Sequence, residues 1–303
     1  MCDSRVVVAA MACAAVATAT AEASNGDKCA KKCDNQRPNV IFILLDDAGY
    51  GDFGCYGQTK IETPNIDALA ARGIRFTDMY AGAPVSAPSR CTLMTGLHSG
   101  HAQIRSNDEM LSRGDVWSID AMRTNPELEG QAPMAAGTTT VATVMRDAGY
   151  RTAMIGKWGL GGPNSKSTPI DMGFDYFYGY LCQRMAQCYY PPFLYNGLER
   201  EYTANPRMNL GDKLDKGADP YDTASYKKFT GPTYSPDAIY DYFEPLLRKE
   251  RYGSPMHKVY ELVQTTLRNV DGESLEARII KTIAAIDIVG QYDRIAPTRQ
   301  NIV

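Results

Sequence analysis

Residues 84–96 read PVSAPSRCTLMTG, and the rest of the chain is interpreted around this stretch. Its pattern is typical of a tight turn that enters a helix. Pro88 suits the first helical turn, because proline lacks the N–H that would be unpaired there, and Gly96 suits the position just past the helix end. We therefore expect Ser86 at the mouth of the helix, with Arg90 four residues on facing the same side. Unpaired N–H groups and the helix dipole favour an anion at such a mouth.

A second informative stretch is the apolar run NVIFILL, residues 39–45. Its branched and aromatic residues predict a buried central strand. Asp46 and Asp47 follow directly, and a glycine-rich loop comes after them. Adjacent carboxylates repel each other unless a cation lies between them, and their oxygens suit Ca²⁺ or Mg²⁺. The alternative at this point is a solvated turn after the strand.

The spacing of apolar residues predicts further elements in alternation. Helices are expected over residues 63–73, 138–147, 237–249 and 274–288, and strands over residues 74–80 and 151–155. The intervening segment 156–196 is dense in Gly, Tyr, Phe and Pro, which suggests long structured loops over a sheet edge. The order of these elements argues for a layered α/β domain.

The composition and the first residues indicate the class and location of the protein. A formal net charge of -3 over 303 residues gives no electrostatic case for nucleic-acid binding. Residues 1–23 contain a small apolar run and an Ala-x-Ala site before Ser24, which predicts a signal peptide followed by a linker over residues 24–37. No stretch is long enough for stable membrane insertion. We therefore expect a secreted or periplasmic protein.

Six cysteines would remain after removal of the leader. Cys29 with Cys33, and Cys182 with Cys188, could form local disulfides in an oxidising compartment. Unpaired buried thiols are the alternative for these residues. A zinc site is not expected, because the spacings do not match the usual ligand pairs and no histidine is nearby.

Three motifs resemble the signatures of one family, the sulfatases. The first is SAPSR at residues 86–90 with LMTG at residues 93–96, the second spans the residues around Asp46 and Asp47, and the third is TAMIGKWGLG at residues 152–161. The resemblance implies an alkaline-phosphatase-like α/β fold with a mixed sheet between helices. It also implies that residues 38–250 are the amino-terminal part of a catalytic domain, with an unmatched tail over residues 251–303.

The same resemblance implies a role for each residue of the motifs. Ser86 would be oxidised to formylglycine by a maturation enzyme, and the hydrated aldehyde would be the nucleophile. Asp46, Asp47 and the oxygen of residue 86 would bind Ca²⁺, with Mg²⁺ the weaker candidate. Lys157 would contact the sulfate, and Arg90 would stabilise the nucleophile. The implied reaction is the hydrolysis of a sulfate ester of a small molecule or a polysaccharide.

The chain also departs from the family pattern. Many relatives have His where this chain has Gly159, and a subgroup has His where Gln187 and Cys188 stand, so a general acid is not identifiable. A later Asp-Asn-Gly motif and a second lysine are absent, which gives the appearance of truncation at the C-terminus. For His98 and His101 a structural role is expected rather than a catalytic one.

Two other functions remain open. One is a phosphoester or phosphonate hydrolase of the same superfamily that uses unmodified Ser86, because tetrahedral anions of both kinds suit the same binding site. The other is a catalytically inactive binding protein that keeps the sheet and the sulfate pocket.

Overall fold

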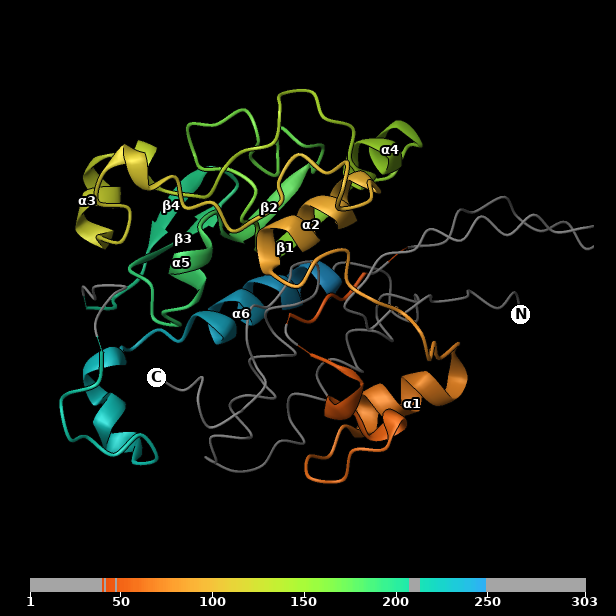
Figure 1. The fold of residues 1–303 in the computed structure, drawn as a ribbon, viewed down its shortest axis with the longest axis horizontal. Helices are drawn as coiled ribbons and strands as arrows, with labels where there is room; N and C mark the ends of the chain where they lie inside the picture. The colour runs from red at the N-terminus through yellow and green to blue at the C-terminus, as the bar shows by residue number, and fades with distance from the viewer. Residues whose placement is uncertain (1–39, 41, 47, 207–212, 249–303) are drawn as a thin grey trace, which may run out of the picture.

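In the computed structural model of the chain, the described residues are 40, 42–46, 48–206 and 213–248. They form a mixed α/β fold that contains a four-stranded sheet (Figure 1). The strands lie in the order β1 (Ala153–Lys157), β2 (Tyr176–Tyr180), β3 (Phe193–Asn196) and β4 (Glu199–Tyr202). β1 and β2 are parallel, whereas β2 with β3 and β3 with β4 are antiparallel. The predicted α/β class with a mixed sheet is confirmed.

The core is completed by helices that come before, between and after the strands in the sequence. The described α-helices are α1 (Pro64–Arg72), α2 (Ser86–Thr95), α3 (Ile119–Thr124), α4 (Val141–Asp147), α5 (Gln183–Ala186) and α6 (Ser235–Arg248). Buried side chains of α2 to α6 share one hydrophobic cluster with the first three strands. α6 packs against β1 and β2, and α2 packs against α4. α1 lies apart from the sheet and has no buried residue (Figure 1).

Local sequence signals account for the helix boundaries. α4 starts after Thr140, whose hydroxyl accepts the N–H of Thr143 at 3.2 Å in a reciprocal capping box. α2 ends at Gly96, which has a left-handed backbone with φ of 68° and donates its N–H to the carbonyl of Thr92 at 2.8 Å. The helices predicted over residues 63–73, 138–147 and 237–249 are present, with ends that move by a few residues, and so is the helix expected between Ser86 and Gly96.

Two predicted strands are wrong. The described residues of the run 39–45 form no strand, although Leu44 and Leu45 are buried. Residues 74–80 are also irregular, and Ile74 and Tyr80 are 80% and 73% exposed. A strand needs a neighbour for its backbone N–H and C=O groups, and none of the described strands pairs with either segment. The apolar pattern of a single segment does not show whether another strand will pair with it.

The later part of the sheet also differs from expectation. The strand predicted over residues 151–155 is present as β1, shifted by two residues, so that Lys157 ends the strand rather than following it. The expectation of loops over residues 156–196 is wrong, because this segment contains β2, α5 and β3. Its glycines and aromatic residues contribute to the central strands β2 and β3 and do not form loops that cover the edge of the sheet.

α6 is held on the sheet by tyrosines of β2. The ring of Tyr178 stacks on that of Tyr242 with centroids 3.7 Å apart. The buried Tyr180 hydroxyl donates to Ser235 Oγ, which in turn donates to the carbonyl of Tyr189 at 2.6 Å. The first turn of α6 is thereby fixed beside the end of β2.

The remaining sequence predictions concern cysteines and targeting. Cys55, Cys91, Cys182 and Cys188 are unpaired thiols in this structure, so the disulfide alternative for Cys182 and Cys188 is not formed. The cysteine pair 29 and 33, the expected signal peptide and linker, and the helix predicted over residues 274–288 lie outside the described residues. Within the described ranges, no helix has the length and apolar character needed to cross a bilayer.

Candidate active site

α2 places Ser86 and Arg90 together. Ser86 is the first residue of the helix, and Arg90 stands one turn later. The Nε–H of Arg90 donates to Ser86 Oγ at 3.0 Å, and the two residues are 2% and 1% exposed. The helix spacing thus produces the predicted pairing of a hydroxyl with a cation at the helix mouth.

The end of β1 brings a second cation to this pair. Lys157 is the last residue of β1, and its Nζ lies 2.9 Å from Asp46 Oδ2. The same carboxylate oxygen accepts the hydroxyl of Ser86 at 3.3 Å and lies 3.4 Å from Arg90 Nη2. Arg90 Nη1 also donates to the carbonyl of Lys157, which ties α2 to β1. The structure therefore brings together four of the five residues that the sequence singled out.

The cluster is buried and contains charges of both signs. The cationic side chains of Arg90 and Lys157 both approach the carboxylate of Asp46, which is 7% exposed. Interactions between charges are much stronger in such surroundings than in water. Ser86 lies at the centre of this arrangement and at the positive end of the helix dipole of α2. The arrangement suits an anionic ligand beside the serine oxygen.

The oxygen atoms beside Ser86 are of the kind that binds a hard divalent cation, but they are too few to complete its coordination. Asp46 and Ser86 contribute a carboxylate and a hydroxyl oxygen within hydrogen-bond distance of each other. Asp47, the other predicted ligand, lies outside the described residues. Among the residues that the structure describes, no three His, Cys, Asp or Glu side chains gather as a metal-binding group. Ca²⁺ normally takes six to eight oxygens, so these residues alone do not complete a site for it.

Gln183 fills the space beside Gly159, where relatives were expected to carry an imidazole. Gly159 has φ of 78°, and a Cβ on it would lie 2.7 Å from both Cγ and Nε2 of Gln183. Gln183 is 2% exposed and is fixed at its backbone N–H by Gln131 Oε1 at 3.1 Å. The absence of a side chain at residue 159 is therefore matched by a neighbour that occupies its volume, which the sequence alone did not indicate.

The histidines are not part of the cluster. His98 and His101 follow the C-terminal end of α2, whereas Ser86 stands at the opposite end of that helix. Both are exposed, and Nδ1 of His98 accepts the N–H of Gly100 at 3.0 Å, which is a local turn contact. In the described part of the chain, no histidine hydrogen-bonds to Ser86. The general acid that the sequence left unidentified is not found there either.

Asn107 is a contact of the helix mouth that the sequence interpretation missed. Its Oδ1 accepts the backbone N–H of Ala87 at 2.8 Å, next to Ser86. No spacing rule could have paired these positions, because they are 20 residues apart and joined by an irregular segment.

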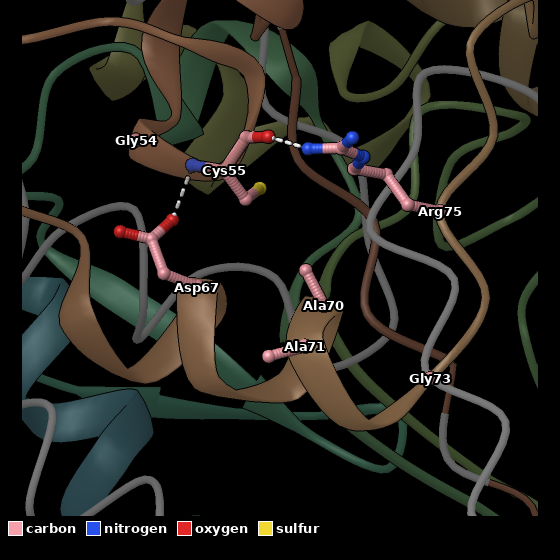
Figure 2. Close-up of a pocket in the computed structure, with 7 residues that line it drawn as sticks. All are labelled: Gly54, Cys55, Asp67, Ala70, Ala71, Gly73 and Arg75. Atoms are coloured by element: carbon pink, nitrogen blue, oxygen red, sulfur yellow. Dashed lines mark hydrogen bonds between the residues drawn. The ribbon is translucent and has the colours of Figure 1, made fainter.

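A hollow of about 490 Å³ lies elsewhere, between α1 and the 3-10 helix Gly54–Tyr56 (Figure 2). Its polar groups are already paired: Asp67 Oδ1 accepts the N–H of Cys55 at 2.6 Å, and Arg75 donates to the carbonyl of Cys55. Burial, followed by the nearby Asp67 carboxylate, raises the pKa of the Cys55 thiol. This hollow shares no residue with the cluster at Ser86 and offers no activated nucleophile.

A comparison with known protein families shows to which family the chain belongs. The family described as Sulfatase matches residues 38–259, which include all the residues of the cluster. The chain belongs to the sulfatase family.

Relatives of this sulfatase-family chain come from distant organisms. It is 38% identical over 157 residues to steryl-sulfatase of Homo sapiens, which covers 50% of this chain and 25% of that protein. It is 38% identical over 152 residues to N-acetylgalactosamine-6-O-sulfatase of Bacteroides thetaiotaomicron, covering 47% and 26%. The matches thus span about a quarter of the length of these relatives.

A solved structure of a protein with its substrate D-glucosamine-2-N,6-O-disulfate is similar as well, with 26% identity and a TM-score of 0.47. The similarity covers 72% of this sulfatase-family chain and 32% of that one.

Proposed function

We propose that this chain carries the nucleophile and part of the sulfate-binding site of a sulfuric ester hydrolase, which cleaves a sulfate ester to an alcohol and inorganic sulfate. The observation that carries the proposal is the position of Ser86 Oγ, between Arg90 Nε at 3.0 Å and Asp46 Oδ2 at 3.3 Å. Membership of the sulfatase family supports the choice of sulfate as the anion.

Each residue of the cluster has a role in this proposal. Arg90 donates to the oxygen on residue 86 and stabilises negative charge that develops on it. Lys157, whose ammonium lies at the same carboxylate oxygen, provides a cation for the sulfate oxygens. Asp46 orients both cations and accepts a hydrogen bond from the hydroxyl of Ser86. Burial excludes water from these contacts and so strengthens them.

Two further components are proposed from the family and the donor atoms. Conversion of Ser86 to formylglycine would supply an aldehyde hydrate, which is a better nucleophile than a serine hydroxyl. Ca²⁺, held by Asp46, Asp47 and the oxygen of residue 86, would neutralise charge on the sulfate oxygens. Mg²⁺ is the less suitable ion. The remaining ligands would be water or residues beyond the described ones.

The mass of the peptide that contains Ser86, together with sulfate release from an aryl sulfate ester, tests the proposal. We expect a loss of two hydrogens from Ser86 and release of sulfate that Arg90→Ala abolishes. An intact serine and no sulfate release would contradict the sulfatase mechanism.

A second function is favoured by the direct hydrogen bond from Ser86 to the Asp46 carboxylate. A carboxylate at this position can accept the hydroxyl proton, so an unmodified serine could attack a phosphoester or phosphonate. Release of phosphate by a protein with intact Ser86 would support that alternative. A chain that binds sulfate but hydrolyses neither ester would instead be the inactive binding protein.

The substrate class, the location and the maturation partner are also proposed. Steryl-sulfatase and N-acetylgalactosamine-6-O-sulfatase are named for a steroid and a sugar substrate. We therefore propose a sulfated small molecule or polysaccharide as the substrate. The leader expected over residues 1–23 is the basis for the proposed secreted or periplasmic location, and the proposed conversion of Ser86 implies a formylglycine-generating enzyme as the maturation partner.

A further inference from the structure

α2 begins without a side-chain cap of its own. Val85 stands at the N-cap position and has no side-chain atom that can accept a hydrogen bond. Pro88 has no N–H, and the N–H of Ser89 already donates to the carbonyl of Val85 at 3.2 Å. The first-turn N–H groups that remain for a cap or an anion are therefore those of Ser86 and Ala87.

Asn107 takes one of these two donors. Its Oδ1 accepts the Ala87 N–H at 2.8 Å. Because a backbone N–H can only donate, the amide oxygen must face Ala87, and the Nδ2 group is directed elsewhere. No hydrogen bond joins Nδ2 to any residue that the structure describes. Asn107 is exposed whereas Ser86 is 1% exposed, so solvent reaches Asn107 but hardly reaches the serine beside the residue that it caps.

The charge of the cap is as informative as its position. Aspartate caps a helix N-terminus as well as asparagine does, and its negative charge interacts favourably with the dipole. At this mouth a carboxylate would also compete with an anionic ligand for Arg90 and Lys157. The neutral amide caps the helix, leaves the field of the two cations in place, and replaces the lost backbone donor with an N–H of its own.

We propose that Asn107 is a further anion-binding residue of this site. Its Oδ1 fixes the backbone beside Ser86, and its Nδ2 donates a hydrogen bond to an oxygen of the bound sulfate group. This inference rests on the proposed function, because it assigns the anion at the helix mouth to the group that the reaction removes.

Binding of inorganic sulfate to the full chain, measured by calorimetry beside the Tm, tests the inference. Asn107→Asp keeps the cap and changes the donor to a charged acceptor. We expect its Kd for sulfate to rise at least about tenfold, while its Tm stays equal to or above that of the wild type. Asn107→Ala loses both functions, so its Tm falls and its sulfate binding also weakens.

Asn125→Asp is the matched control. Asn125 Oδ1 accepts the N–H of Glu127 at 3.1 Å at the start of the 3-10 helix Pro126–Leu128, beside α3. This variant should change neither the Kd for sulfate nor the Tm by a measurable amount.

The outcomes separate a structural role from a binding role. If Asn107 were only a cap, Asn107→Ala would bind sulfate as the wild type does at a temperature well below its Tm, where the variant is still folded. That result, or a wild type that binds no sulfate, overturns the inference. If sulfate affinity depends on Asn107 but the wild type releases no sulfate from an ester, the proposed hydrolase activity fails and the assignment of Asn107 stands.

Discussion

The ammonium of Lys157 lies 2.9 Å from Asp46 Oδ2, although 111 residues separate them in the chain. Both side chains are almost fully buried, and Arg90 approaches the same oxygen at 3.4 Å. The nucleophile end of α2 is thus joined to the last residue of β1 through one carboxylate.

Removal of this carboxylate should destabilise the fold. In Asp46→Asn, the buried Arg90 and Lys157 lose the negative charge of the carboxylate that both approach, and we expect the free energy of unfolding to fall by about 3 kcal/mol. Asp120→Asn is the control, because its ion pair with Arg123 lies at the surface, where such pairs contribute about 1 kcal/mol or less. Urea unfolding measures both variants. Equal losses in the two would show that the buried cluster contributes no more than a surface pair.

Arg90→Lys should show that the shape of the guanidinium matters as well as its charge. Arg90 contacts Ser86 Oγ, the carbonyl of Lys157 and the Asp46 carboxylate through three different nitrogens. A lysine ammonium cannot reproduce this fork. We expect a loss of about 2 to 3 kcal/mol in the free energy of unfolding, whereas the exposed Arg146→Lys should be neutral. Stability of Arg90→Lys equal to that of the wild type would rule out the fork as a structural element.

Gly159→Ala should separate backbone strain from the contact with Gln183. The left-handed backbone alone costs a non-glycine residue about 1 to 2 kcal/mol, and the new Cβ would also meet Gln183. Gly137→Ala is the matched control, because Gly137 has φ of 75° with nothing within 4 Å of its Cβ position. We expect Gly159→Ala to be more destabilising than Gly137→Ala. Adding Gln183→Ala to the Gly159→Ala variant should remove only the part of the cost that exceeds that of Gly137→Ala. If Gly137→Ala costs as much, Gln183 does not restrict residue 159.

The link between β2 and α6 should respond asymmetrically to its two ends. Ser235→Ala leaves the buried hydroxyl of Tyr180 without its acceptor, which costs about 1 to 3 kcal/mol. Tyr180→Phe removes that hydroxyl, and Ser235 keeps its bond to the carbonyl of Tyr189. We expect the serine variant to be the less stable of the two by urea unfolding. The reverse order would place the stabilisation in the tyrosine hydroxyl itself.

Alkylation should show that the fold protects the thiols of Cys182 and Cys188. Burial raises the pKa of the Cys182 thiol to about 11 and that of Cys188 to about 12, so at pH 8 roughly a thousandth or less of either is thiolate. Their labelling by iodoacetamide, followed by mass spectrometry, should be slow at pH 8 and should rise as the pH approaches these values. Unfolding should abolish the protection. Labelling that appears only after reduction would instead demonstrate a disulfide between Cys182 and Cys188.

The parts of the structure that the sequence predicted are those fixed by local chemistry. Gly96 marks the end of α2 through a contact within one helical turn, and the spacing of Ser86 and Arg90 follows from the helix itself. The segment 74–80 had the alternation of a strand but no partner to pair with, and pairing cannot be read from one segment. Asn107 and Gln183 were missed for the same reason, because each acts on a residue 20 or more positions away.

The burial of Ser86 has a consequence for the timing of synthesis. Arg90 binds the carbonyl of Lys157, which is made 67 residues later, and Ser86 is 1% exposed once these contacts exist. A ribosome that adds about 5 to 20 residues per second needs roughly 3 to 13 s to close this interval. Any enzyme that oxidises Ser86 would therefore need to reach it before these contacts form. A protein that folds before it meets that enzyme would retain Ser86 unmodified.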